Sequence, residues 1–267
     1  MSADTPAFET LSVEPVDEHV AIVRLNRSDA SNALNTQMGR DLVRYFEDTA
    51  LDPKSLRCII LTGAGDKAFC AGGDLKERRG MTDEQWTRQH VIFERMVRAL
   101  IDCPVPIIGA VNGAAYGGGC EIAGACDFLY AAETARFALT EVTLGIMPGG
   151  GGTQTLPRAV GERRAKELIL TGKPFTAAQA REWGLVNEVF PPADLLREAL
   201  ATAAHIARNA PISTRQAKLA IHRGLQSSLR DGLALEIEAY NRMVPTEDRR
   251  EGVLAFNEKR KPNFKGK

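Results

Sequence analysis

Short apolar segments that alternate with amphipathic helical segments are the feature that most constrains the fold of this chain. Residues 58–61 (CIIL) and 105–111 (VPIIGAV) carry no charge, which is typical of strands covered on both faces. Between them, Thr82 and Gln85 have capping-box spacing and start a helical pattern. Strands that alternate with helices pair in parallel, so the sequence predicts an α/β fold.

The pattern changes near residue 192. Further strands are expected at residues 20–25, 128–132, 136–139 and 185–190. From residue 192 on, only helical patterns occur, with breaks at Pro211, Gly224 and Pro245. We therefore divide the chain into an α/β core (residues 1–191) and a helical C-terminal region (192–267). One apolar stripe in the second part runs from Leu196 to Ala207, and another begins at Leu233; both predict core or subunit packing.

Composition restricts the compartment and the partners. The 267 residues contain 34 Lys+Arg and 34 Asp+Glu, a balance that argues against nucleic acid as the main partner. No segment approaches about 18 uninterrupted apolar residues, and the first residues lack a signal-peptide pattern. The five cysteines are odd in number and form no CxxC pair. We expect a cytoplasmic protein without a membrane span, a disulfide framework or a metal site.

Three glycine-rich loops follow apolar segments, at residues 63–77, 112–121 and 145–154. Glycine can place backbone N–H groups against a ligand without side-chain obstruction, so these loops are candidate oxyanion or phosphate sites. Tight turns and close packing would explain the same glycines equally well. The two interpretations remain open for each loop taken alone.

Glu121 is the most informative single residue. It is the only Asp, Glu, Lys, Arg or His in the 24 residues from Cys103 to Cys126. Burial in so apolar a segment would raise its pKa and make it a candidate acid or base. The alternative is a structural glutamate satisfied by a backbone amide or an ion pair. Glu141 precedes a second uncharged stretch, residues 142–157, where a helix-terminal or surface role is also possible.

Other chemistries find less support. No serine lies between Ser55 and Ser213, which excludes a serine nucleophile in the central region. No Walker P-loop is present. Gly63, Gly65 and Ala68 match the dinucleotide fingerprint GxGxxG/A, but the residues after them continue as loop instead of opening a helix.

Four motifs, in this order, strongly resemble the enoyl-CoA hydratase/isomerase (crotonase) superfamily: residues 68–77 (AFCAGGDLKE), 105–127 (VPIIGAVNGAAYGGGCEIAGACD), 137–161 (FALTEVTLGIMPGGGGTQTLPRAVG) and 256–267 (FNEKRKPNFKGK). The resemblance implies an α/β spiral of ββα units with a helical C-terminal trimerisation region. It also implies a homotrimer or a dimer of trimers that acts on an acyl-CoA thioester, with coenzyme A as part of the substrate and no separate cofactor.

The same resemblance assigns roles within the motifs. The backbone N–H groups of Gly73 and Gly118 would bind the thioester oxygen, where enolate charge develops. Glu141 would exchange a proton at the substrate α-carbon, and Glu121 would hold and activate the water that adds at the β-carbon. Gly149 would help to position Glu141 and the water. Two glutamates are typical of hydratases, so the implied reaction is syn addition of water to a trans-2-enoyl-CoA, giving a 3-hydroxyacyl-CoA in fatty acid or branched-chain acyl breakdown.

Contacts with coenzyme A are also implied by the resemblance, at Ala33, Lys67, Ala71, Asp74, Leu75, Lys76, Phe264 and Lys265, with the C-terminal tail often serving a neighbouring subunit. Ser28 and Asp29 stand where relatives often carry Pro and Lys, so a basic contact is not expected there. Residues 78–92, including Trp86, should shape the acyl pocket. Alternative functions are a methylglutaconyl-CoA hydratase-like activity, an enoyl-CoA isomerase and, in another class, an RNA-binding protein.

Overall fold

Two β-sheets organise the fold in the computed structural model, which describes residues 8–267. The larger sheet has the strand order β1 (Leu11–Pro15), β2 (Val20–Leu25), β3 (Cys58–Gly63), β5 (Ile107–Val111), β7 (Phe128–Ala132) and β10 (Glu188–Phe190). The smaller sheet has the order β4 (Ala68–Cys70), β6 (Ala114–Tyr116), β8 (Arg136–Ala138) and β9 (Phe175–Thr176). All neighbouring pairs are parallel except β1–β2 and β8–β9, so the predicted parallel pairing is confirmed for the sheet centres.

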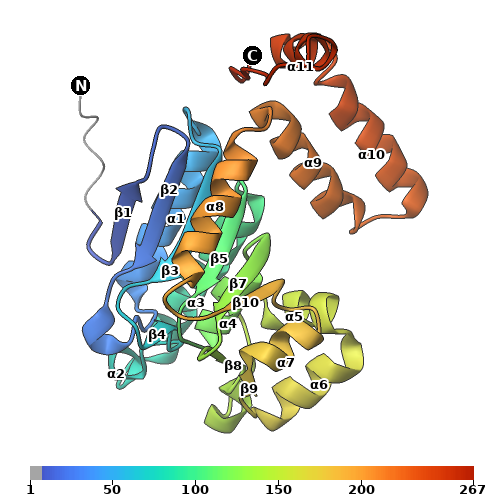
Figure 1. Cartoon of the computed structure of the whole chain (residues 1–267). Helices are drawn as coiled ribbons and strands as arrows, with labels where there is room; N and C mark the ends of the chain where they lie inside the picture. Colours follow the sequence, from blue (N-terminus) through green and yellow to red (C-terminus); the bar gives the residue numbers. More distant parts are fainter. Residues whose placement is uncertain (1–7) are drawn as a thin grey trace.

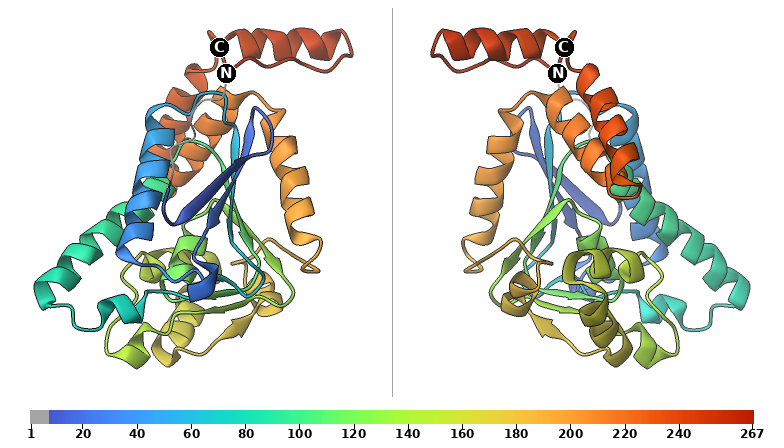
Figure 2. Two further views of the ribbon diagram at one scale, coloured as in Figure 1. Left: turned by 90° about the vertical axis from the view of Figure 1, so that its left-hand side faces the viewer. Right: turned by 90° about the vertical axis from the view of Figure 1, so that its right-hand side faces the viewer.

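Helices cover both faces of the larger sheet and surround the smaller one (Figures 1 and 2). They are η1 (Ser28–Ala30), α1 (Thr36–Leu51), α2 (Leu75–Arg78), α3 (Asp83–Asp102), α4 (Gly118–Gly124), η2 (Glu141–Leu144), α5 (Gly152–Val160), α6 (Glu162–Thr171), α7 (Ala177–Glu182), α8 (Leu195–Ala207), α9 (Pro211–Gly224), α10 (Leu229–Asn241) and α11 (Glu247–Asn257). The left view of Figure 2 shows α8 on one face of the larger sheet and α1 on the other.

The chain repeats a ββα unit. The strand pairs β3–β4, β5–β6 and β7–β8 each give one strand to the larger sheet and the next to the smaller one, and each pair is followed by helix. The strands in the centre of the larger sheet, β3 and β5, are buried along their whole length, as their uncharged sequences predict. The expected α/β arrangement of ββα units is confirmed, and it places the three glycine-rich loops where strands of the two sheets meet helices.

Most predicted boundaries agree with the structure. The α3 helix begins after Thr82, whose side chain and that of Gln85 form the predicted capping box. The strand expected at residues 185–190 is shorter, because the N–H groups of Leu185 and Val186 bond to the Ala180 carbonyl at the end of α7. β1 was not predicted from the sequence, because it is an edge strand, exposed at one end, and lacks an apolar run.

The C-terminal helices divide into two parts. The α8 helix buries Leu195, Ala199 and Ala203 against the larger sheet, so the buried face is shifted from the stripe that was predicted from Leu196, and Ala204 is exposed. The helices α9 to α11 extend away from the sheets (Figure 1). Their apolar side chains are largely exposed, including Ile221, Leu225, Leu229, Leu233, Ile237, Tyr240 and Phe256. No helix among residues 8–267 is long and apolar enough to cross a membrane.

Candidate active site

A cavity of about 460 Å³ lies between α2, α3, α4 and the segment that follows η2. Backbone of the three glycine-rich loops, two carboxylates and an apolar wall from α3 form its lining: Leu34, Ala71, Gly72, Gly73, Leu75, Arg78, Trp86, His90, Phe93, Met96, Val97, Gly117, Gly118, Glu121, Thr140, Glu141, Leu144, Ile146, Met147, Gly149 and Gly150. The cavity therefore brings the three loops to one place, which each loop by itself could not predict.

Two backbone donors face this cavity from neighbouring loops. A Cβ placed on Gly118 would lie 4.0 Å from the Gly73 nitrogen, so the two residues are adjacent. Within residues 8–267, neither N–H group donates to a backbone or side-chain acceptor. Gly117, which precedes α4, has φ 50° and ψ −123°, a conformation that only glycine adopts without strain. This turn leads into α4, whose first residue, Gly118, lines the cavity, and the α4 dipole adds to the positive charge of its N–H.

The close approach of α4 to β4 fixes the two donors relative to each other. A Cβ on Gly119 would lie 2.1 Å from the Cys70 carbonyl oxygen, a distance that no side chain tolerates. Gly73 follows β4 by three residues, and Gly118 is the first residue of α4. The glycine at position 119 is therefore needed for this packing, since only a residue without a side chain lets the two segments meet.

Glu121 is buried, with 5% of its surface exposed, and points from α4 toward the third glycine-rich loop. Its Oε1 accepts hydrogen bonds from the backbone N–H groups of Gly150 (2.7 Å) and Gly152 (2.9 Å). Burial raises the pKa of this carboxyl, while the two N–H donors and the positive charge of Arg78 act against the rise. The two donors stabilise the charged form, so the geometry makes Glu121 a candidate for the ionised carboxylate of the site.

Glu141 begins η2 and is 8% exposed. Its Oε2 is buried and has no hydrogen-bond partner among residues 8–267. Burial is the main cause that raises the pKa of Glu141 to about 7, and the negative charge of Glu121 adds to it. A carboxyl with an unpartnered oxygen is more stable as a neutral acid, so Glu141 is the protonated member of the pair below that pH.

This arrangement can perform proton-transfer chemistry next to a carbonyl. Two free N–H groups can stabilise negative charge that develops on a carbonyl oxygen. One ionised and one protonated carboxyl can accept a proton and donate one in the same turnover. The predicted roles of Gly73, Gly118, Glu121 and Glu141 are compatible with these positions.

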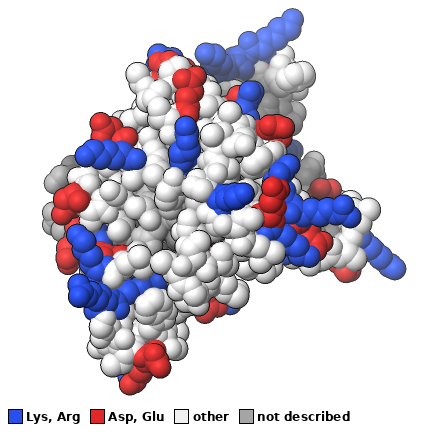
Figure 3. All heavy atoms as spheres, turned by 90° about the horizontal axis from the view of Figure 1, so that it is seen from below, with Lys and Arg blue, Asp and Glu red and all other residues white. Residues whose placement is uncertain are grey.

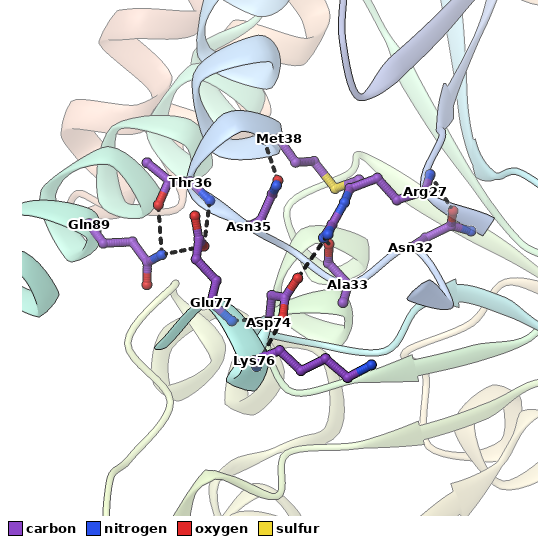
Figure 4. Close-up of polar contacts among 10 residues, drawn as sticks. All are labelled: Arg27, Asn32, Ala33, Asn35, Thr36, Met38, Asp74, Lys76, Glu77 and Gln89. Carbon is purple, nitrogen blue, oxygen red and sulfur yellow. Dashed lines mark hydrogen bonds and ion pairs between the residues drawn. The ribbon is translucent and has the colours of Figure 1, made fainter. Parts of the chain in front are cut away.

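The predicted coenzyme A contacts are only partly in the cavity. Ala71 and Leu75 line it, and so does Gly149, which was predicted to help position Glu141 and the water. Ala33, Lys67, Asp74 and Lys76 are not among its lining residues. Asp74 caps α2 by accepting from the N–H groups of Lys76 and Glu77, and it forms an ion pair with Arg27 (2.9 Å) (Figure 4). Arg27 also donates to the Ala33 carbonyl, so this group of residues holds the loop that carries Gly73.

The C-terminal tail does not reach the cavity of its own chain. The Phe264 carbonyl accepts from Arg57 (2.8 Å), and the Lys265 N–H donates to Asp248 of α11 (2.7 Å). Figure 1 shows the C-terminus beside α11, at the end of the molecule opposite α2. The predicted contacts of Phe264 and Lys265 with coenzyme A therefore stay a prediction, and they could be made only to another copy of the chain.

Sequence reasoning missed several residues of the site. Gly150 and Gly152, which hold Glu121, were not singled out. His90 lines the cavity from α3 beside Trp86, inside the segment 78–92 that was predicted to shape the pocket, but Phe93 and Val97 lie beyond that segment. The spacing of Phe93 and Val97 from His90 was a signal that could have found them, because residues three, four and seven apart lie on one helical face.

Comparisons with known proteins identify relatives of this chain. The model of the family Enoyl-CoA hydratase/isomerase matches residues 16–267. The YngF protein of Bacillus subtilis is 48% identical over 250 residues, which cover 94% of this chain and 96% of that protein. The short-chain-enoyl-CoA hydratase of Clostridium acetobutylicum is 42% identical, over 91% of this chain and 92% of its own.

The same relationship is seen in three dimensions. The crystal structure of an enoyl-CoA hydratase from Bacillus anthracis has a TM-score of 0.95 and 45% sequence identity, with 97% of this chain and 100% of that chain covered. The family model and these relatives match this chain over nearly its whole length. This chain belongs to the enoyl-CoA hydratase/isomerase family.

Proposed function

We propose that this protein is a hydro-lyase that adds water to a trans-2-enoyl-CoA and gives a 3-hydroxyacyl-CoA. The observation that carries the proposal is the pairing of two buried carboxylates, Glu121 and Glu141, in one cavity with two free backbone donors. An isomerase needs to move a proton between two carbons, which one carboxyl can do. A hydratase must also activate water, and the second carboxylate supplies the base for this step.

The residues divide the reaction between them. The thioester oxygen accepts hydrogen bonds from the Gly73 and Gly118 N–H groups, which draws electrons from the double bond. Glu121 accepts a proton from water as the water oxygen bonds to the β-carbon. Glu141 donates its proton to the α-carbon. In this proposal both groups act from the same side of the bound double bond, so the proton and the hydroxyl add to one face of it.

Hydration of crotonyl-CoA is the direct test. The conjugated enoyl thioester absorbs in the ultraviolet, and this absorbance should fall on addition of the purified protein, as water removes the double bond. Activity with 3-enoyl-CoA but not with trans-2-enoyl-CoA would instead identify an isomerase. Salt-sensitive RNA binding without turnover of any enoyl-CoA would favour the RNA-binding alternative. On the face shown in Figure 3, basic and acidic side chains lie interspersed around a broad uncharged area, which gives a polyanion little to bind.

The pH dependence should report Glu141. Its pKa is raised to about 7, so the carboxyl holds its proton below that pH and loses it above. Because Glu141 must donate a proton in the hydration direction, kcat/KM for crotonyl-CoA is expected to fall as the pH rises through about 7. Initial rates measured across this range, at substrate concentrations far below KM, would check this. A flat profile through this range would contradict the assignment of Glu141 as the acid.

We also propose that the protein self-associates and that it is cytoplasmic. The exposed apolar side chains of α9 to α11, among them Leu229 and Phe256, support the homotrimer or dimer of trimers implied by the resemblance. Light scattering on the purified protein would measure the assembly.

The cysteines at positions 58, 70, 103, 120 and 126 are all free, which supports a reducing compartment such as the cytoplasm.

A further inference from the structure

Arg78 is the one Lys or Arg side chain among the described residues that line the cavity. It ends α2, and its guanidinium lies over the ring of Trp86, 4.4 Å from the ring centroid, and 5.6 Å from the centroid of Phe93. Both aromatic residues belong to the α3 wall of the cavity. A cation is therefore placed on the apolar side of the site, where an acyl group made only of hydrocarbon would leave it without a partner.

A hydrogen-bond network holds Arg78 from behind. Its Nε donates to Oε1 of Gln89 (2.8 Å). Gln89 is 3% exposed, and its amide nitrogen donates to Oγ1 of Thr36 and Oε2 of Glu77, each at 2.8 Å. The Thr36 N–H donates to the same Glu77 oxygen (2.9 Å), as Figure 4 shows. The side-chain oxygen of Gln89 thus orients Arg78, and its side-chain nitrogen joins α3 to α1 and α2.

The outer edge of the guanidinium is free. The bond to Gln89 is the one hydrogen bond that the Arg78 side chain makes within residues 8–267, and it uses Nε. Stacking on Trp86 uses the face of the group and leaves the Nη1 and Nη2 donors, which lie in its plane, available. Burial lowers the pKa of Arg78, while Glu77, Glu121 and Glu141 act against this decrease, so the group stays charged.

The catalytic glutamates do not neutralise this cation by direct contact. Glu121 is held by Gly150 and Gly152, and the Glu141 Oε2 has no partner. A fixed, half-buried guanidinium with two free donors matches a carboxylate, which accepts two parallel hydrogen bonds. The nearby negative charge of Glu121 would repel a second carboxylate in the cavity, and Arg78 would offset that repulsion.

The position of Arg78 also limits the length of the acyl group. Its Nη1 would lie 3.1 Å from a Cβ placed on Gly73, one of the two donors assigned to the thioester oxygen. A carboxylate that binds Arg78 must therefore be only a few bonds from the thioester. The matching ligand is a short acyl chain that ends in a carboxylate.

We propose that Arg78 is a specificity-determining residue that binds this carboxylate, and that the preferred substrates are short trans-2-enoyl-CoA thioesters of dicarboxylic acids. This inference rests on the proposed hydratase function and names its substrate class. The step itself is unchanged: water adds across the double bond, and the distal carboxylate remains intact and bound to Arg78.

Three substrates and three variants test the inference. The substrates are glutaconyl-CoA, the corresponding amide, which has the same shape without the charge, and crotonyl-CoA. The wild-type protein should prefer glutaconyl-CoA to the amide by at least about tenfold in kcat/KM. Arg78→Met should reduce kcat/KM for glutaconyl-CoA by about 10²-fold, because it leaves the carboxylate unpaired in the cavity. The losses for the amide and crotonyl-CoA should be less than about tenfold.

Two further variants serve as controls. Arg78→Lys keeps the charge but not the fork, and should lie between the wild type and Arg78→Met for glutaconyl-CoA. Arg79→Met removes the exposed neighbouring charge, which is not part of the cavity lining, and should leave all three substrates unchanged. Thermal melting of each variant would show whether it folds. The comparison of glutaconyl-CoA with its amide on the wild type does not depend on any variant.

Several outcomes would overturn the inference. Equal losses on all three substrates in a folded Arg78→Met protein would mean that Arg78 acts on the thioester or on the glutamates. Wild-type hydration of crotonyl-CoA without a preference for glutaconyl-CoA over its amide would reject the carboxylate site and leave the hydratase function standing. Failure to hydrate any of the three would reject the proposed function itself.

Discussion

Replacing Glu141 with glutamine is expected to lower kcat for enoyl-CoA hydration by about 10²- to 10⁴-fold. Glutamine has the shape of the neutral acid but no proton that it can give to the α-carbon. The side chain is buried and one of its oxygens has no partner, so the substitution removes no hydrogen bond of Oε2 and should not destabilise the fold. Melting temperature and crotonyl-CoA kinetics, measured on the same preparation, would separate the two effects.

Glu121→Gln provides the matched comparison. The Gly150 and Gly152 N–H groups can still donate to the amide oxygen, but the base for water is lost, so hydration should fall by about 10²-fold or more. Glu133→Gln, which changes an exposed glutamate, should have no effect. Full hydratase activity in either buried variant would remove that residue from the mechanism. If Glu121→Gln kept conversion of 3-enoyl-CoA while Glu141→Gln lost it, the site would act as an isomerase.

Gly119→Ala is expected to give the second large effect. The added methyl group would overlap the Cys70 carbonyl oxygen, 2.1 Å away, and would push α4 from β4. The Gly73 and Gly118 donors would then move apart, although neither is mutated. Because one donor of this kind is worth about 10²–10³ in rate, we expect kcat to fall by about 10²-fold. Overpacking should also lower the free energy of unfolding by about 1–3 kcal/mol.

The control for this variant is Gly224→Ala in α9. The nearest atom to a Cβ at that position is the Gly232 Cα, at 3.7 Å, which is ordinary contact. Both variants add one methyl group to a helical glycine, so a difference between them reports the packing at α4. Chemical denaturation and crotonyl-CoA kinetics would measure both quantities. Wild-type stability and kcat in Gly119→Ala would show that the donors are not fixed by this contact.

Much of the site was accessible from sequence because its signals are local. The isolation of Glu121 among uncharged residues predicted a buried carboxylate, and the structure confirms the burial. The glycine-rich loops marked where backbone lines the cavity, since a missing side chain is visible in the sequence itself. For Glu141 the residues alone left a surface role open. The resemblance, and then the burial of its Oε2, decided between the alternatives.

What the sequence by itself determined is the order and type of most elements, the capping of α3 at Thr82, and the residue types from which an acid, a base and backbone donors could come. These depend on periodicity and on neighbouring residues. Only the tertiary structure decided that Gly150 and Gly152 hold Glu121, across 29 and 31 residues of chain, and that Arg78 is fixed on Trp86 by Gln89. The physical reason is that burial, the direction of a free N–H group and the partner of a charge are set by contacts between distant segments.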